Sequence, residues 1–192
     1  MRTKTLLMVI AAAASLSACG NTGTSIDLEN TNPLVATRYG DELADTLANI
    51  VIQNDPISKE PGMRQIIEQE IARAKSIAMR GRQEAKNGAQ GAIIAEKESV
   101  TGYALLMADV LWLSSDFETS PGPDLHVYLT TIVDPRGETF PDQTAMDLGV
   151  IRSVYGAQEY ALPSRVDPAK MRTLVLFDTK LNRIYGFAQL SR

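Results

Sequence analysis

Residues 122–129 read GPDLHVYL, and this stretch decides how the second half of the chain folds. Its Gly-Pro pair favours a turn, and the residues after it alternate between aliphatic and polar or aromatic side chains, as in a β-strand. His126 and Tyr128 share one face of that strand, and the leucine and valine side chains share the other. We therefore expect a buried aliphatic face and an exposed, polar face that carries the only histidine.

Short runs of β-favouring residues recur on both sides of this stretch. With it, seven such runs lie at residues 100–107, 110–114, 125–133, 147–151, 159–162, 173–177 and 183–190. Turn residues separate them, as in the SPGP stretch at 120–123 and the DPRG stretch at 134–137. The pattern predicts an antiparallel β-sandwich of about seven strands over residues 95–192.

The first half of the chain has a different period. Apolar residues between Ala36 and Ile50 recur at spacings of three and four, and so do those between Met63 and Ala78. A proline-bounded loop separates the two stretches, so we expect an amphipathic helical hairpin over residues 34–90 and an α+β fold class. The apolar stripe of each helix must be buried against the core or against a partner. Charges of mixed sign disfavour a membrane-surface helix.

The N-terminal residues have the pattern of an exported protein. Arg2 and Lys4 precede an uncharged, mostly apolar stretch at residues 5–16, which is too short to span a membrane and has the length of a signal-peptide core. The LSACG sequence at residues 16–20 then resembles a bacterial lipobox.

The lipobox resemblance implies a membrane anchor. Residues 1–18 are expected to be a signal peptide that is cleaved between Ala18 and Cys19, and Cys19 is expected to be acylated, for example with palmitate. Two or more acyl chains anchor a protein stably, so membrane lipid is the first expected partner. Residues 19–33 are polar and are expected to form a tether. By resemblance to the sorting rules of enterobacterial lipoproteins, Gly20 favours the outer membrane, facing the periplasm, within the bacterial cell envelope.

Several blocks of the C-terminal half carry a resemblance to a known family. Residues 122–129 match a G-P-D-L-x-V-Y-L segment, residues 147–163 match a D-L-G…G-x-Q-x-Y-x-x-P block, and residues 173–190 match a closing segment that contains I-W-C. On these blocks the chain resembles the DM-thirteen domain family (electron-transfer DM) from about residue 98 to residue 190. The resemblance implies a small β-sandwich that is proposed to be redox active.

Asp178 occupies the position of the cysteine on which that redox proposal depends. A carboxylate neither cycles between thiol and disulfide nor supplies a thiolate ligand, so the departure favours a binding or structural version of the domain. Alternation places Asp178 on the same strand face as Leu174 and Leu176. We expect it to be a structural residue at the end of its strand, paired with Arg172, Arg183 or turn amides.

The remaining residues suggest little catalytic chemistry. His126 is expected at the surface, the Ser114-Ser115-Asp116 stretch is expected in a turn, and Trp112 is expected in the core. Acidic residues that lie in or beside loops, and that we expect to be solvated rather than metal-bound, are Asp116, Glu118, Asp124 and Asp134. No catalytic residue, metal or cofactor is therefore expected. A net charge of −4 without a basic cluster argues against nucleic acid as a partner.

Three functions remain open at this point. The sequence favours an anchored envelope lipoprotein whose β-domain binds or supports an envelope protein partner without enzymatic activity. The alternative is the redox or electron-transfer accessory role that the family name implies, which Asp178 weakens. The third is a carbohydrate-binding or hydrolytic domain that uses loop carboxylates and Trp112.

Overall fold

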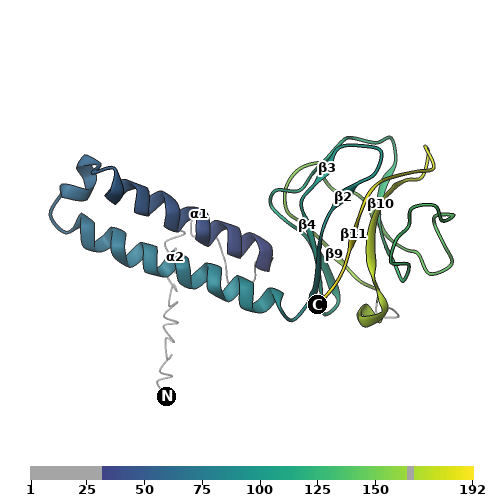
Figure 1. The fold of residues 1–192 in the computed structure, drawn as a ribbon, viewed down its shortest axis with the longest axis horizontal. Coiled ribbons are helices and arrows are strands. Elements are labelled where there is room, and N and C mark those ends of the chain that lie inside the picture. The colour runs from purple at the N-terminus through teal and green to yellow at the C-terminus, as the bar shows by residue number, and fades with distance from the viewer. Residues whose placement is uncertain (1–31, 164–166) are drawn as a thin grey trace, which may run out of the picture.

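The computed structural model describes residues 32–163 and 167–192. A helical hairpin comes first, formed by α1 (Pro33–Ile52), a short 3-10 helix η1 (Pro56–Lys59) and α2 (Met63–Ala85). It extends away from the β-rich part of the molecule, with the start of α1 and the end of α2 nearest to the strands (Figure 1). The amphipathic period thus predicted both helices, and Asn32 caps α1 by accepting a hydrogen bond from the backbone N–H of Leu34.

Small residues let the two helices approach closely. The buried positions are Pro33, Ala36, Gly40 and Ala44 on α1, and Ile67, Ala74, Ala78, Gly81 and Ala85 on α2. A methyl group on Gly40 would lie 2.5 Å from the carbonyl oxygen of Ala74, and one on Gly81 would lie 2.6 Å from Oγ1 of Thr37. Both glycines are therefore required by the distance between the helices.

Eleven short antiparallel strands follow within the described residues. Their bounds are β1 Ala89–Ala92, β2 Ile94–Ala95, β3 Val100–Thr101, β4 Tyr103–Met107, β5 Val110–Leu113, β6 Glu118–Thr119, β7 Leu125–Thr130, β8 Met146–Val150, β9 Gln158–Ala161, β10 Thr173–Asp178 and β11 Arg183–Gln189. A short 3-10 helix η2 (Pro168–Lys170) precedes β10. The α+β class is confirmed, with more strands than the seven or so that the sequence predicted.

Two sheets form the layers of the β-rich part. One has the order β1-β4-β5-β9, the other has the order β2-β11-β10-β7-β8, and β3 pairs with β6 separately. The main core contains the inward-facing aliphatic side chains of both layers, among them Leu111, Leu113, Val127 and Leu176. The alternation read from residues 125–129 is therefore confirmed for its aliphatic face.

Strands β1 and β2 lie in the segment that the sequence assigned to the end of the hairpin and the linker after it. The AQGA sequence of β1 has no β-branched or aromatic residue, so its propensity gives no strand signal. Pairing with β4 makes it a strand, in the register Ala89 to Leu106. Gly91 lies directly against the carbonyl group of Gln189, where any larger residue would collide. Long-range contacts of this kind are invisible to a local pattern.

The expectation of an exposed face on β7 was wrong. Tyr128 is only 7% exposed and packs in a second apolar cluster with Phe140, Val175, Phe177 and Phe187. The chain between β7 and β8 supplies Phe140, whose ring meets that of Tyr128 edge-on at 5.5 Å. The five-stranded sheet is thus covered on both faces, which the alternation of a single strand does not reveal.

Candidate functional site

Several elements meet at the junction between hairpin and sandwich, where a cavity lies. The side-chain amide of Asn32 donates a hydrogen bond of 2.7 Å to the carbonyl oxygen of Leu113, which ties the start of α1 to β5. A second close contact lies just after the end of α2, where a methyl group on Gly88 would lie 2.7 Å from Leu105. The hairpin is therefore attached to the four-stranded sheet at two points.

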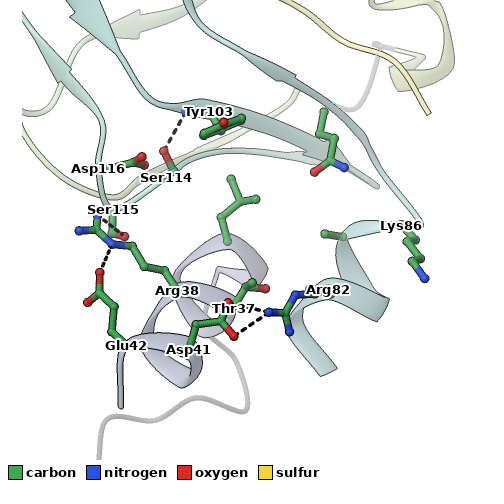
Figure 2. A pocket seen from close by; sticks show the side chains of 13 residues that line it. Thr37, Arg38, Asp41, Glu42, Arg82, Lys86, Tyr103, Ser114, Ser115 and Asp116 are labelled. Atoms are coloured by element: carbon green, nitrogen blue, oxygen red, sulfur yellow. Dashed lines mark hydrogen bonds and ion pairs between the residues drawn. The ribbon is translucent and has the colours of Figure 1, made fainter. Parts of the chain in front are cut away.

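A cavity of about 510 Å³ lies at this junction. Its lining comes from α1, the end of α2, β1, β4 and the residues that follow β5, and it is partly apolar, with Leu34, Ala85 and the ring of Tyr103 (Figure 2). Tyr103 is 51% exposed although it belongs to a strand of the sheet. An exposed aromatic ring beside an apolar floor is a feature of binding sites.

Ion pairs within the hairpin neutralise part of the charge on the cavity wall. Arg82 donates to both carboxylate oxygens of Asp41, at 2.6 and 2.7 Å. Arg38 donates to Glu42 at 2.6 Å and to the hydroxyl oxygen of Ser115 at 3.3 Å. The hydrogen bond to Glu42 raises the pKa of Arg38 above its usual value. Each guanidinium group at the cavity thus has a carboxylate partner within the hairpin.

Lys86 and Asp116 lie at opposite sides of the cavity (Figure 2). A guest with an apolar body and polar ends matches this arrangement, because the wall offers a cation on one side and a carboxylate on the other. The Ser114 hydroxyl oxygen accepts a hydrogen bond of 2.8 Å from the backbone N–H of Tyr103. The Ser114-Ser115-Asp116 stretch lies on the wall of this cavity, whereas His126 belongs to the other sheet, so the fold does not bring these residues together.

Asp178 is completely buried at the end of β10. Its Oδ1 accepts hydrogen bonds from the backbone N–H groups of Lys180 and Leu181, at 3.0 and 2.9 Å, and its Oδ2 accepts one of 3.0 Å from Asp124. Backbone amides thus hold the carboxylate, as in one of the expected pairings. Arg183 forms an ion pair with Glu98 instead.

The Asp178 position does not fit a metal or a redox group in this chain. Both oxygens of the carboxylate already accept backbone hydrogen bonds, and Gly122 and Tyr185 close the space around it. A methyl group on Gly122 would lie 2.5 Å from Oδ2 of Asp178 and 2.9 Å from the Tyr185 hydroxyl oxygen. Gly122 is thus needed next to the carboxylate, which the sequence alone did not suggest.

His126 lies between two carboxylates rather than free at the surface. Its Nδ1 is 2.9 Å from Oδ2 of Asp147, and its Nε2 is 3.6 Å from Oδ1 of Asp124. The side chain is 17% exposed, because it shares the outer face of β7 with the buried Tyr128. Burial, and next the charge of Asp147, raise the pKa of Tyr128. The expectation of a surface histidine therefore needs correction.

The four loop carboxylates do not come together. Asp134 accepts hydrogen bonds from Arg136, which lower its pKa to about 2, and Asp124 accepts one from Thr179, which lowers the pKa of Asp124. Asp116 lies at the junction cavity, and Glu118 belongs to β6. Among residues 32–163 and 167–192, no group of three or more acidic, histidine or cysteine side chains is arranged to hold a metal ion.

Trp112 differs from its predicted place. Leu111 and Leu113 point into the main core, so Trp112 between them lies on the outer face of the four-stranded sheet and is partly exposed. The cavity residues Arg38, Arg82 and Tyr103 were not predicted at all. The spacing of Arg38 and Glu42 predicts a pair within one helix, but nothing in the sequence indicates that this pair faces β5.

Ala18 and Cys19, the predicted cleavage and lipidation residues, lie outside the described residues. Among the helices of the described part, none is long and apolar enough to cross a membrane.

Comparison with known families gives one match. The family model described as Electron transfer DM13, that is, the DM-thirteen family, matches residues 83–190. The match begins inside α2 and includes β1 and β2, so it starts earlier than the residues on which the sequence resemblance was based. No curated protein and no solved structure matches the chain.

Proposed function

The chain belongs to the DM-thirteen family of electron-transfer domains, and from this premise we propose that it is a non-enzymatic binding module held at the bacterial cell envelope by a lipid anchor. The junction cavity is the observation that carries the binding role. It combines an apolar floor, an exposed tyrosine ring and fixed charges, and it is built by both parts of the molecule.

The guest of this cavity is an apolar group with polar ends, on a small molecule or on the side chains of an envelope protein. Burying about 100 Å² of apolar surface contributes about 2.5 kcal/mol, so a guest that covers Tyr103 and Leu34 gains useful affinity. Lys86 favours an anionic group on one part of the guest, and Asp116 favours a donor on the opposite part.

Two exposed tyrosines allow a matched test of the binding role. Tyr103 lines the cavity and is 51% exposed, whereas Tyr155 is 63% exposed and is not among the cavity residues. A photo-crosslinking phenylalanine analogue is placed at one position or the other in the full-length protein. The crosslinked products that form in the protein's own membranes are then compared. We expect one discrete crosslinked species from position 103 and none from position 155. Identical patterns from both positions would contradict a site at the cavity.

The anchor half of the proposal rests on Cys19 and its lipobox-like surroundings. The Cys19→Ser variant is expected to lose incorporation of labelled fatty acid and to remain as an uncleaved or mislocalised precursor. Since Cys19 is the only cysteine, normal labelling of this variant would eliminate the lipoprotein proposal.

Electron transfer stays as the second candidate because the matching family is named for it. Asp178 weakens it, since a buried carboxylate with three backbone donors replaces the cysteine of the family resemblance. An absorption spectrum and metal analysis of the protein purified from membranes distinguish the two candidates. A stoichiometric chromophore or metal would favour electron transfer over the binding module.

A further inference from the structure

Another cavity, of about 420 Å³, lies at one end of the sandwich, and we call it the end cavity. Its lining comes from the start of β1, the turn between β4 and β5, η2 and the residues after β11. The backbones of Ser191 and Gln90 exchange two hydrogen bonds, so the C-terminal residues lie beside β1. Figure 1 shows the C-terminus at this place, next to the connection from α2 to β1. The end cavity and the junction cavity share no lining residue.

The floor of the end cavity is the border of the main core. Leu106 and Leu190 line the cavity, belong to the core and are each 3% exposed. Ala89 and Met171 also line it and pack against the same core. The carbon part of a ligand in this cavity therefore exchanges water for aliphatic side chains, which favours binding.

Arg172 and Arg192 are the two charged side chains of the lining, and both are exposed. Within residues 32–163 and 167–192, neither guanidinium group forms a hydrogen bond, an ion pair or a ring contact. Every other arginine of those residues has such an interaction: Arg38, Arg64, Arg73, Arg82, Arg136 and Arg183 pair with carboxylates, Arg152 lies over the ring of Tyr160, and Arg80 also has an interaction. The two unpartnered arginines of the described part thus line one cavity.

Backbone hydrogen bonds hold both arginines in place. The N–H of Arg172 donates to the carbonyl oxygen of Thr130 at 2.8 Å, and its own carbonyl oxygen accepts a hydrogen bond of 2.7 Å from the N–H of Leu190. Arg192 directly follows Ser191, which is paired with Gln90. A ligand therefore has to order only the two side chains, which limits the entropic cost of binding.

The polar groups of the end cavity are suited to an anion. No acidic side chain is among its lining residues, and the other polar side chains there, Asn87 and Ser191, can both donate hydrogen bonds. A guanidinium group donates two parallel hydrogen bonds to the oxygens of a phosphate or a carboxylate. A phosphate monoester carries about two negative charges at neutral pH, which matches two guanidinium groups better than the single charge of a carboxylate does.

We propose that the end cavity binds a phosphate monoester, with its phosphate group held by Arg172 and Arg192 and its carbon part on the aliphatic floor. A small soluble ester and the headgroup of a phosphatidic acid both present this group. The inference rests on neither the lipid anchor nor the junction cavity.

Titration calorimetry with butyl phosphate tests the site in the full-length protein, purified in a neutral detergent. We expect one site for butyl phosphate, binding of inorganic phosphate that is weaker by about fivefold or more because it lacks the carbon part, and no binding of butanol. No binding of butyl phosphate, or equal binding of butanol, would overturn the proposal.

Variants locate the site. Arg172→Gln and Arg192→Gln are each expected to bind butyl phosphate more weakly by about tenfold or more, because hydrogen bonds between charged groups are lost. Lys170→Gln is the matched control and is expected to bind like wild type, since Lys170 is exposed, pairs with Asp167 and does not line the cavity. Ser115→Trp, in the junction cavity, is also expected to bind like wild type. Equal weakening in Lys170→Gln, or loss of binding in Ser115→Trp, would contradict a site at the end cavity.

Vesicles distinguish the two sources of the phosphate group. The full-length protein is reconstituted into phosphatidylcholine vesicles that also contain either phosphatidic acid, a monoester, or phosphatidylglycerol, an anionic diester. Loss of butyl phosphate binding only with phosphatidic acid would assign the site to a lipid headgroup, and full binding in both would assign it to a soluble ester. Equal loss in both kinds of vesicle would show that surface charge acts rather than the monoester, and it would contradict the proposal.

Discussion

The carboxylate of Asp178 connects three pieces of chain that are far apart in the sequence. It accepts hydrogen bonds from Asp124, in the stretch before β7, and from Lys180 and Leu181, in the turn between β10 and β11. Gly122 leaves the space that this arrangement needs. The sequence predicted the residue's role from strand parity and the following turn, but the contact with residues 122–124 depends on the pairing of β10 with β7.

Replacing Asp178 by asparagine is expected to destabilise the protein. The side-chain oxygen still accepts from the β10–β11 turn, but the new amide faces the N–H of Asp124, so two donors meet in a buried place. We expect a loss of about 1–3 kcal/mol in the free energy of unfolding. Denaturant unfolding of wild type and variant measures it, and equal stability would mean that the Asp124 contact is not maintained in solution.

Asp178→Cys restores the residue of the family motif at this position. It is expected to bind no cofactor, because the surrounding side chains leave no room for one, with Gly122 and Tyr185 packed directly beside the carboxylate. An absorption spectrum of the purified variant checks this. A new chromophore in the variant, absent from wild type, would show that the site accommodates a redox group after all.

Asp142 gives the protein a predictable response to acid. Burial raises its pKa, but hydrogen bonds from the Thr144 hydroxyl and N–H and from the Thr130 hydroxyl outweigh burial, and the net pKa lies below the usual value. Because the folded-state pKa is lower than the unfolded one, the carboxylate stabilises the fold above the unfolded pKa. That contribution is lost as the pH falls through the folded pKa.

The Asp142→Asn variant tests this sign. At pH 7 we expect it to be less stable than wild type by about 1–3 kcal/mol, since charge-assisted hydrogen bonds are lost. The difference should shrink as the pH falls through the lowered folded-state pKa of Asp142, because the wild-type carboxyl then becomes protonated as well. Unfolding curves from pH 7 to pH 2 measure both values. A difference that stays constant over this range would contradict the assignment.

At the scale of elements, the sequence predicted what has a local period. Both helices follow from apolar spacing, β7 follows from alternation, and β10 and β11 follow from runs of β-favouring residues. β1 does not, because its AQGA sequence has little strand propensity and becomes a strand only by pairing with β4. β2 does not either, because it is only two residues long and is defined by its pairing with β11. The buried outer face of β7 was missed for a related reason, since the covering Phe140 arrives from a long connection.

The junction depends on Asn32, which combines two roles. Its side-chain oxygen accepts a hydrogen bond from the backbone N–H of Leu34 and so caps α1. Its side-chain amide donates a hydrogen bond to the backbone carbonyl oxygen of Leu113. We expect Asn32→Ala to lower stability by about 0.5–2 kcal/mol and to loosen the cavity, so that the crosslink from position 103 weakens. Asp55→Ala is the matched control, because Asp55 caps η1 at the far end of the hairpin. If both variants behaved alike, the contact with β5 would have no role.

At the scale of the whole molecule, the division between hairpin and sandwich depends on where β1 belongs. The family match begins at residue 83, and β1 is an edge strand of the four-stranded sheet. We therefore expect a fragment that starts at residue 86 to fold on its own as a β-rich domain, and one that starts at residue 96 to be unstable. Circular dichroism and thermal unfolding compare them. A stable fragment from residue 96 would show that β1 and β2 are dispensable.

The hairpin and the sandwich together create the cavity at their junction, which is why no local pattern in the sequence indicated it. Arg38 lies on α1, Tyr103 on β4 and Ser115 beyond β5, and only the fold brings them together. The binding function proposed for this protein thus belongs to the junction and to neither part alone.

Binding of anilinonaphthalene sulfonate, an apolar dye with one anionic group, tests this claim most directly. The dye is titrated into a soluble form of the protein that starts at Gly20, and into two variants of that form. Ser115→Trp fills the cavity, and Tyr155→Trp is the control, because Tyr155 is not among the cavity residues. We predict one saturable site in the wild-type form and in Tyr155→Trp, and at least tenfold weaker binding in Ser115→Trp. Equal binding by all three forms, or none by the wild-type form, would contradict a binding site at the junction.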